Sequence, residues 1–264
     1  MSASKLITLI GHKAFATVTE AGYIFMLCYE SIYWILAGAF FRQPVRLHLI
    51  AFEAVKVGIQ AIPIVIILCF SVGVMLAIQG IETLKVFGAE SQVIYGITFS
   101  MTREFSPLIV GILIAGRSGS AITAKIGSMM GSQEVDALIV IGINPVRYLV
   151  SPLLLAMLVM LPSLTFLGDI AGLLGGALYS TLTLDMTFDN YIARTFDVLH
   201  SADLFQGLAK SVIFSLLITI IGASNGFQVR GGAEGVGVAT TRSVVFAISS
   251  IVMADMIFTY FINR

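Results

Sequence analysis

Charged residues are scarce in this sequence, and their scarcity limits what the protein can be. Only 11% of the 264 residues are Asp, Glu, Lys or Arg, whereas a soluble domain has roughly 25%. So few charges cannot cover a globular surface in water, which excludes a water-soluble domain. The fifteen acidic residues balance the fifteen basic ones, so no net charge favours binding to nucleic acid.

Cysteines, histidines and catalytic motifs are also rare or missing. The two cysteines, Cys28 and Cys69, lie in apolar stretches, where we interpret them as small buried side chains. The three histidines are scattered, which predicts no metal site, and we expect no cofactor. The sequence has no P-loop, G-x-x-x-x-G-K-[ST], so it does not bind ATP in that way. It also lacks H-E-x-x-H and G-x-S-x-G, which argues against an intramembrane enzyme.

Long apolar runs dominate what the sequence does contain. Hydrophobic residues make up 58% of the chain, and the mean hydropathy is +0.98. Continuous runs of about 20 apolar residues are typical of membrane-spanning helices, whereas a β-barrel alternates. The third run is long enough to tilt, or to bend at Pro152 and Pro162. The sequence therefore predicts an all-α integral membrane protein with five spans, at about Ala61–Gly80, Val93–Gly116, Tyr148–Ser180, Leu208–Phe227 and Ser243–Ile262.

Residues 1–56 form a separate N-terminal region ahead of the five-span domain, residues 57–264. Within this region Ala21–Phe41 is apolar but contains Glu30. Its middle also carries four aromatic residues: Tyr23, Tyr29, Tyr33 and Trp34. Because a membrane span normally places such rings at its ends, we favour a helix lying in the membrane surface over a sixth span.

The distribution of basic residues indicates the orientation of the spans. If the N-terminus is cytoplasmic, ten basic residues fall on the cytoplasmic side: Lys5, Lys13, Arg42, Arg46, Lys56, Arg117, Lys125, Arg147, Arg230 and Arg242. Four fall on the outer side: Lys85, Arg194, Lys210 and Arg264. Basic residues concentrate on the cytoplasmic side of membrane proteins, so this asymmetry predicts a cytoplasmic N-terminus and an outer C-terminus.

The cytoplasmic loop between the second and third spans contains a predicted short helix at about residues 127–142. Ser128 or Ser132 can cap its start, while Gly142 and Pro145 can end it. Its apolar residues repeat at helical spacing (Met130, Val135, Leu138, and Ile139 or Ile141), and two acids, Glu134 and Asp136, lie near its start. From this pattern alone the helix either packs on the spans or docks as a coupling helix on an ATPase subunit.

We single out four charged residues inside predicted spans, where each costs about 2.5–3.5 kcal/mol on insertion scales and must face a cavity or a partner. Arg103 and Glu104 are adjacent, with Pro107 one turn later. The other two are Asp169 and Asp255. These carboxylates could serve a proton-coupled secondary transporter, although the sequence lacks the internal repeat of such carriers.

Asp169 lies in a stripe of glycines spaced by four: Gly168, Gly172 and Gly176. Small residues at this spacing let another helix approach closely. We interpret Gly168, Asp169 and Gly172, together with Asp255, as packing residues within the membrane. We expect Asp169 to form hydrogen bonds inside the bundle.

Two segments resemble a known family. "AGRSGSAITAKIGSMMGSQEVDALIVIGINPVRYLVSP" and "GGAEGVGVATTRSVVFAISSIVMADMIFT" are similar to sequences of the MlaE/YrbE family, the permeases of ABC-type MCE lipid-transport systems. A third segment, "LAKSVIFSLLITIIGASNGF", agrees more weakly, and the resemblance runs from about Leu49 to the C-terminus. It implies an ABC-exporter-like permease fold: a homodimer of five-span subunits, each with an N-terminal interfacial helix, in the inner membrane.

The same resemblance implies partners and a cargo. A separate ATP-binding subunit hydrolyses ATP, an MCE-domain protein stands on the outer side, and a STAS-domain protein often accompanies them. The permease itself is not an enzyme, and phospholipid or another lipid moves between the inner membrane and the outer envelope.

The resemblance also assigns roles to residues. The motif of the coupling helix carries over to Gln133, Glu134, Asp136, Ala137 and Leu138. Relatives often read S-E-Q-I-D-A-L, so the swapped Gln133 and Glu134 leave open which carboxylate contacts the ATPase. The glycine-rich Gly231–Gly237 lacks the lysine of a phosphate cradle and is interpreted as a tight connection near the ATPase.

For Arg103, Glu104 and Pro107 two interpretations stay open. Pro107 frees the carbonyl of Arg103 and can bend the span, which opens space near the charges. Following the resemblance, the charges of both subunits would line a central lipid cavity. Alternatively, Arg103 and Glu104 form an internal pair that locks the spans together.

Overall fold

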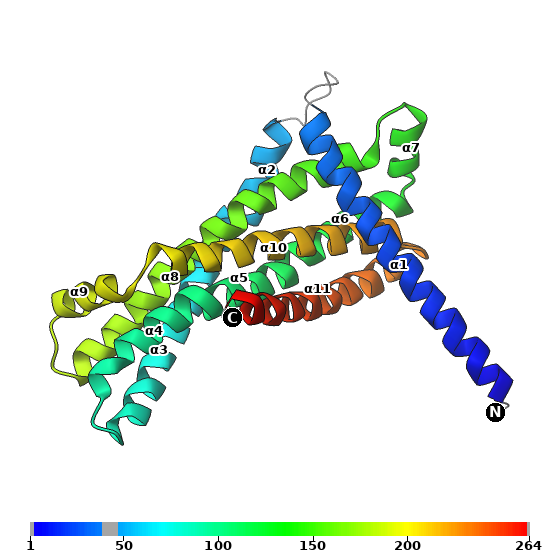
Figure 1. Ribbon diagram of the computed structural model, residues 1–264. Coiled ribbons are helices and arrows are strands. Elements are labelled where there is room, and N and C mark those ends of the chain that lie inside the picture. Colours follow the sequence, from blue (N-terminus) through cyan, green and yellow to red (C-terminus); the bar gives the residue numbers. More distant parts are fainter. Residues whose placement is uncertain (1–2, 39–46, 263–264) are drawn as a thin grey trace.

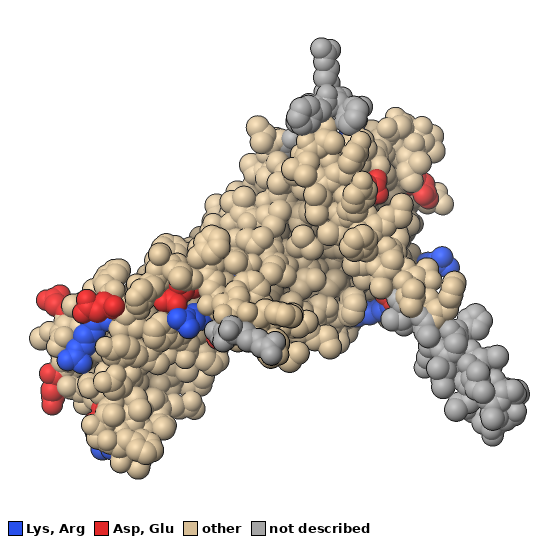
Figure 2. Space-filling model, in the orientation of Figure 1, with Lys and Arg blue, Asp and Glu red and all other residues tan. Residues whose placement is uncertain are grey.

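The computed structural model describes residues 3–38 and 47–262, and every element within those ranges is helical. Five of the helices are long and apolar enough to cross a membrane: Leu47–Lys85, Glu90–Gly131, Val146–Thr183, Ser201–Phe227 and Gly232–Ile262. These helices confirm the five predicted spans. They lie side by side along the long axis of the molecule (Figure 1). The broad middle of the face in Figure 2 is nearly free of charged side chains, as a membrane-embedded belt requires.

The spans are assembled from shorter elements. Span one consists of α2 (Leu47–Val57) and α3 (Ile62–Lys85), joined by a 3₁₀ turn. Span two consists of α4 (Val93–Ser100), α5 (Ser106–Ile114) and α6 (Ser120–Gly131). Spans three, four and five are mainly α8 (Ser151–Thr183), α10 (Ser201–Phe227) and α11 (Gly232–Ile262). A short helix outside the spans, α9 (Phe188–Val198), lies between α8 and α10 and was not expected from the sequence.

Two prolines follow π-helical turns. Pro107 lies just after the turn Met101–Phe105, and Pro152 lies just after the turn Val146–Val150. A proline cannot donate a backbone hydrogen bond, and its ring crowds the carbonyl four residues earlier. One extra residue in the preceding turn relieves both problems, so the π turn accommodates Pro107 within span two. Pro162, by contrast, lies inside α8.

Glycines set the distance between α8 and its neighbours. A Cβ atom on Gly73 of α3 would lie 1.9 Å from the carbonyl oxygen of Gly172, and one on Gly175 would lie 2.1 Å from the carbonyl oxygen of Phe70. A Cβ on Gly168 would lie 2.6 Å from the Ser106 hydroxyl oxygen. The glycine face of α8 thus meets the backbone of α3 and side chains of span two at distances that a larger residue would prevent.

The loop between spans two and three differs from the prediction. Its helix, α7, covers only Glu134–Val140, because residues 127–131 belong to α6. Gln133 precedes α7 with φ +59° and provides no side-chain cap, so the predicted serine caps are wrong. This left-handed residue interrupts the helical backbone and separates α6 from α7. The predicted closure at Gly142 is confirmed, since its φ is +78° and the Ile143 amide donates to the Leu138 carbonyl oxygen at 2.8 Å.

The N-terminal helix α1 (Ala3–Ala37) crosses the outside of the bundle at a steep angle to the spans (Figure 1). It is not among the five helices that qualify as spans, and whether it lies in the membrane surface stays a prediction. Leu27 and Ser31 are buried against the bundle, whereas Phe25 and Tyr29 are exposed. Arg42, Arg46 and Arg264, which entered the orientation argument, lie outside the described residues.

Candidate functional site

Arg103 and Glu104 do not pair with each other but with residues of spans four and five. The Arg103 guanidinium lies over the Phe99 ring, 4.4 Å from its centroid, and binds Asp203 near the start of α10. Its Nε donates to Oδ1 of Asp203 at 2.8 Å, and its Nη2 lies 2.5 Å from the same oxygen. Asp203 also accepts the His200 backbone N–H as part of the α10 capping box. Arg103 therefore anchors the start of span four to the middle of span two.

Glu104 belongs to a second set of contacts centred on Lys210 of α10. The Lys210 ammonium donates to Oε2 of Glu104 at 2.5 Å and to the Thr259 hydroxyl at 2.8 Å. It also lies 2.9 Å from Oδ1 of Asp255 on α11. The Lys210 side chain is fully buried, so its charge is matched only by these groups among the residues that the structure describes.

These five residues form what we call the ionic cluster: Arg103, Glu104, Asp203, Lys210 and Asp255. Arg103 and Glu104 are each about one-third exposed, with side-chain exposures of 35% and 34%. Asp203 and Lys210 are buried, and the Asp255 side chain is 14% exposed. The cluster thus joins spans two, four and five and still offers one cationic and one anionic group at its surface.

Two members of the ionic cluster, Asp203 and Lys210, were not recognised from the sequence. Lys210 was counted as an outer residue, but it lies within α10, so the asymmetry of basic residues becomes ten against three. Its position inside the predicted span Leu208–Phe227 was the available signal. Asp255, expected to be a packing residue, is an ion-pair partner of Lys210.

Asp169 behaves differently from the prediction. It is only 2% exposed, and neither carboxylate oxygen has a hydrogen-bond partner among the described residues. The expected hydrogen bond within the bundle is therefore not formed. The nearby Ser106 hydroxyl donates instead to the Thr165 carbonyl oxygen at 2.9 Å.

The residues assigned to the coupling helix lie on or beside α7, at one end of the molecule (Figure 1). Gln133, Glu134, Asp136 and Ala137 are exposed, and Leu138 is half-buried. Val135 is buried against the bundle, while Ile139, Val140 and Ile141 are exposed by 58%, 86% and 67%. This end of the chain thus presents two carboxylates beside an uncovered apolar strip. At the connection between α10 and α11, positive φ angles at Gly231 and Gly232 confirm the predicted tight turn before α11.

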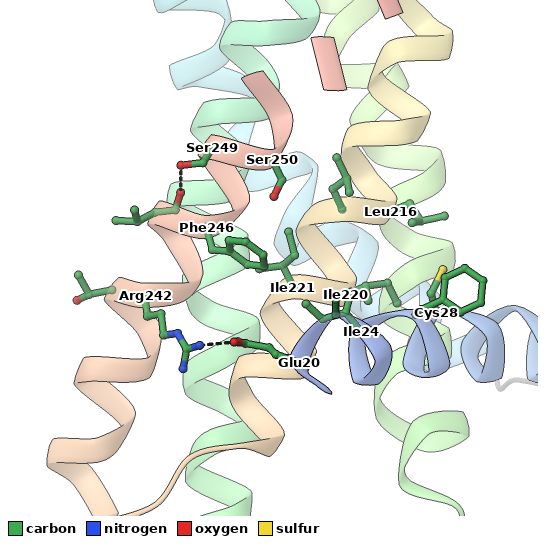
Figure 3. A pocket seen from close by; sticks show the side chains of 15 residues that line it. Glu20, Ile24, Cys28, Leu216, Ile220, Ile221, Arg242, Phe246, Ser249 and Ser250 are labelled. Carbon is green, nitrogen blue, oxygen red and sulfur yellow. Dashed lines mark hydrogen bonds and ion pairs between the residues drawn. The ribbon is translucent and has the colours of Figure 1, made fainter. Parts of the chain in front are cut away.

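A cavity of about 770 Å³ opens between α1, α10 and α11 (Figure 3). Its walls are apolar side chains such as Ile24, Leu216 and Phe246. At one end the Arg242 guanidinium lies 2.5 Å from Oε1 of Glu20, which joins α11 to α1. The cavity is lined by residues 241–250 of α11, whereas the ionic cluster uses the later Asp255. A cavity with an apolar lining and an ion pair at one end suits an amphiphilic molecule, which has an apolar tail and a polar head.

Comparison with known proteins identifies the family. A family model described as Permease MlaE matches residues 50–261, nearly the whole of the five spans. The chain belongs to the MlaE permease family. The resemblance seen in the sequence is thereby confirmed, and α1 precedes the part that matches. Family membership and the five apolar helices together make this MlaE-type permease a multi-pass protein of the inner membrane.

Individual relatives carry matching names. A probable ABC transporter permease protein of Rickettsia felis is 35% identical over 218 residues, which is 83% of this chain and 84% of the relative. The intermembrane phospholipid transport system permease protein MlaE of Haemophilus influenzae is 30% identical over 230 residues, 86% of this chain and 88% of the relative. The chloroplastic protein TRIGALACTOSYLDIACYLGLYCEROL 1 of Arabidopsis thaliana is 30% identical over 206 residues, 78% of this chain and 59% of the relative.

Proposed function

We propose that this chain is the permease subunit of an ABC-type MCE lipid transporter that moves phospholipid between the inner membrane and the outer envelope. Two copies form a homodimer, and a separate ATP-binding subunit hydrolyses ATP on the cytoplasmic side. An MCE-domain protein receives or delivers lipid on the outer side, and a STAS-domain protein binds with the ATPase. The N-terminus is cytoplasmic and the C-terminus is periplasmic.

The ionic cluster is the observation that carries this proposal. Charged groups in a membrane span are costly, and here two of them, Arg103 and Glu104, are left one-third exposed rather than fully covered. A phospholipid head group carries a phosphate and, in common lipids, an ammonium group, which complement these two side chains. The apolar surfaces around the cluster suit the acyl chains, so the cluster can hold a head group at mid-span while the tails stay in an apolar environment.

The proposed coupling runs from the ATPase to the ionic cluster through span two. The carboxylates of Glu134 and Asp136 and the exposed apolar strip of α7 dock on the ATPase. Helix α7 packs against α6, which continues through the π turn Ala115–Gly119 into α5 and then to Arg103. Since π turns are local departures from α-helical geometry, they are places where a shift of α6 can alter the position of the charges.

The proposal is tested by crosslinking lipid in the assembled complex. A photoreactive amino acid is placed at Arg103 or Glu104 and, as a control, at Ile67 of α3, which is 63% exposed. We expect the span-two positions to capture phospholipid in a manner that depends on ATP, and Ile67 to capture lipid independently of ATP. Absence of capture at both span-two positions, or lipid movement driven by a proton gradient without the ATPase, would contradict the proposal.

A further inference from the structure

A second, smaller cavity of about 280 Å³ carries charges that the transport proposal does not use. It lies between α2, α6 and α8, beside the π turn Ala115–Gly119. We call it the basic pocket, because its polar lining consists of three cations and one carboxylate, with Gln60 and Ser118: Lys56, Arg117, Lys125 and Glu53. Neither the ionic cluster nor the cavity beside α1 shares a lining residue with it.

Arg117 has unused hydrogen-bonding capacity in the basic pocket. Its Nη2 donates to Oε1 of Gln60 at 3.1 Å. Its Nη1 is buried and has no hydrogen-bond partner among the described residues. A buried guanidinium nitrogen without an acceptor is costly, and the planar guanidinium is shaped to bind two oxygens of one carboxylate or phosphate. An oxyanion beside Arg117 would supply the acceptor that Nη1 lacks among the described residues.

The charges of the basic pocket are not balanced within it. Lys125 is paired with Glu53, whose Oε1 lies 2.5 Å from the Lys125 ammonium. Gln60 is neutral and the lining carboxylate Glu53 is paired with Lys125, so Arg117 forms no ion pair within the described residues. Lys56 lies over the Phe52 ring, 5.0 Å from its centroid, and forms no ion pair within the described part of the chain. The net charge of the lining is thus positive, which favours an anionic ligand.

The surroundings of the basic pocket point to a lipid rather than a free ion. Phe52, Val55 and Ile59 are exposed by 51%, 46% and 54% on the same helical segment that carries Lys56 and Gln60. Exposed apolar side chains of this kind mark surfaces that bind protein or membrane, and beside a basic pocket they suit the acyl chains of a bound lipid. A basic pocket between helices at the cytoplasmic membrane surface is a recurring form of recognition for anionic head groups.

We propose that the basic pocket binds the phosphate of an anionic phospholipid of the surrounding membrane, with Arg117 and Lys56 as its ligands. The phosphate oxygens accept hydrogen bonds from Nη1 of Arg117 and from the Lys56 ammonium, and the acyl chains lie along Phe52 and Ile59. This site is separate from the cargo path and does not depend on the cluster at Arg103 and Glu104. It binds its lipid whether or not the ATPase is present.

The test uses the purified full chain in detergent and native mass spectrometry with added phosphatidylglycerol, phosphatidylcholine or inorganic phosphate. The wild type is expected to retain phosphatidylglycerol in preference to phosphatidylcholine. Arg117→Gln and Lys56→Gln should each weaken that retention by about fivefold, the effect of about one basic residue at an anionic surface. Arg230→Gln, which removes an exposed arginine before α11, is the matched control and should change nothing.

The outcomes separate the sources of the phosphate. If inorganic phosphate at millimolar concentration displaces phosphatidylglycerol, the pocket is a free-anion site and the lipid proposal is wrong. Equal retention by wild type and both variants would also overturn it. Because Lys56 is exposed, Lys56→Gln keeps the test valid even if Arg117→Gln fails to fold. Loss of cargo crosslinking at Arg103 with unchanged phosphatidylglycerol retention would affect only the transport proposal.

Discussion

The ammonium of Lys210 lies 2.5 Å from Oε2 of Glu104, although the two residues are 106 positions apart in the sequence. This ion pair fixes the rotation of α10 relative to span two, because only one face of α10 carries a positive charge at that depth. Asp255 and Thr259 complete the contacts of Lys210 from α11. Three spans thus meet at one fully buried cation, and several consequences can be measured.

Replacing that cation should destabilise the protein strongly. In Lys210→Met, Glu104 and Asp255 lose their counter-charge inside the bundle. Removing one partner of a buried ion pair costs about 3–5 kcal/mol, and we expect the lower end because Glu104 is one-third exposed. The measurement is thermal unfolding in detergent, with the exposed Lys85→Met as control. A melting temperature equal to that of the control would mean that the pair contributes nothing.

Glu104→Gln should separate transport from stability. The variant keeps an oxygen that can accept from Lys210, and Asp255 still balances the lysine charge, so the melting temperature should change little. Lipid transport in the reconstituted complex should fall by about tenfold, the effect of losing one charge-assisted hydrogen bond of about 1.5 kcal/mol. The opposite result, normal transport with a lowered melting temperature, would favour a purely structural role.

Asp136→Lys should uncouple the permease from its ATPase. The substitution reverses the charge at the exposed start of α7, where we propose that the ATPase docks. We expect less of the ATP-binding subunit to co-purify, and less ATP hydrolysis, while the amount of permease in the membrane stays normal. Asp189→Lys on α9, at the other end of the molecule, is the matched control. If co-purification, hydrolysis and lipid transport all stay at wild-type levels, α7 is not the coupling element.

Replacing Gly175 or Gly96 by alanine should change the stability of the protein in opposite directions. A Cβ on Gly175 would lie 2.1 Å from the Phe70 carbonyl oxygen, which can move only if α3 separates from α8. Gly175→Ala should therefore cost about 1–3 kcal/mol of stability. Gly96 of α4 has no atom within 4 Å of its Cβ position, so Gly96→Ala should add up to about 1 kcal/mol through helix propensity. Melting temperatures that shift in the same direction would contradict this packing.

The orientation of the spans can be tested by cysteine labelling in intact cells. With Cys28 and Cys69 replaced, a cysteine at Gln133 should be protected from an impermeant reagent, whereas one at Asp189 should react. Gln133 and Asp189 are both exposed, so accessibility within the fold does not limit labelling. Rapid labelling of the Gln133 position from outside the cell would reverse the proposed topology.

The sequence by itself determined the number and approximate positions of the five spans. In the membrane interior every backbone N–H and C=O must be paired within the protein, so a continuous run of about 20 apolar residues has one stable form, a helix. Local chemistry also determined the closure of α7 at Gly142 and the turn at Gly231, because both positions need a positive φ. The start of α7 could not be predicted, since Gln133 adopts a left-handed conformation that its residue type does not favour.

Only the tertiary structure decided which charges pair. The sequence indicated that Arg103, Glu104 and Asp255 must face a cavity or a partner, because unpaired charges in a span are costly. It did not indicate that Arg103 binds Asp203 or that Glu104 and Asp255 share Lys210. Each pair joins separate helices, so its formation depends on how far those helices are rotated and shifted against one another. That arrangement follows from side-chain packing along their whole lengths, including the glycine contacts of α8, and no local run of residues contains it.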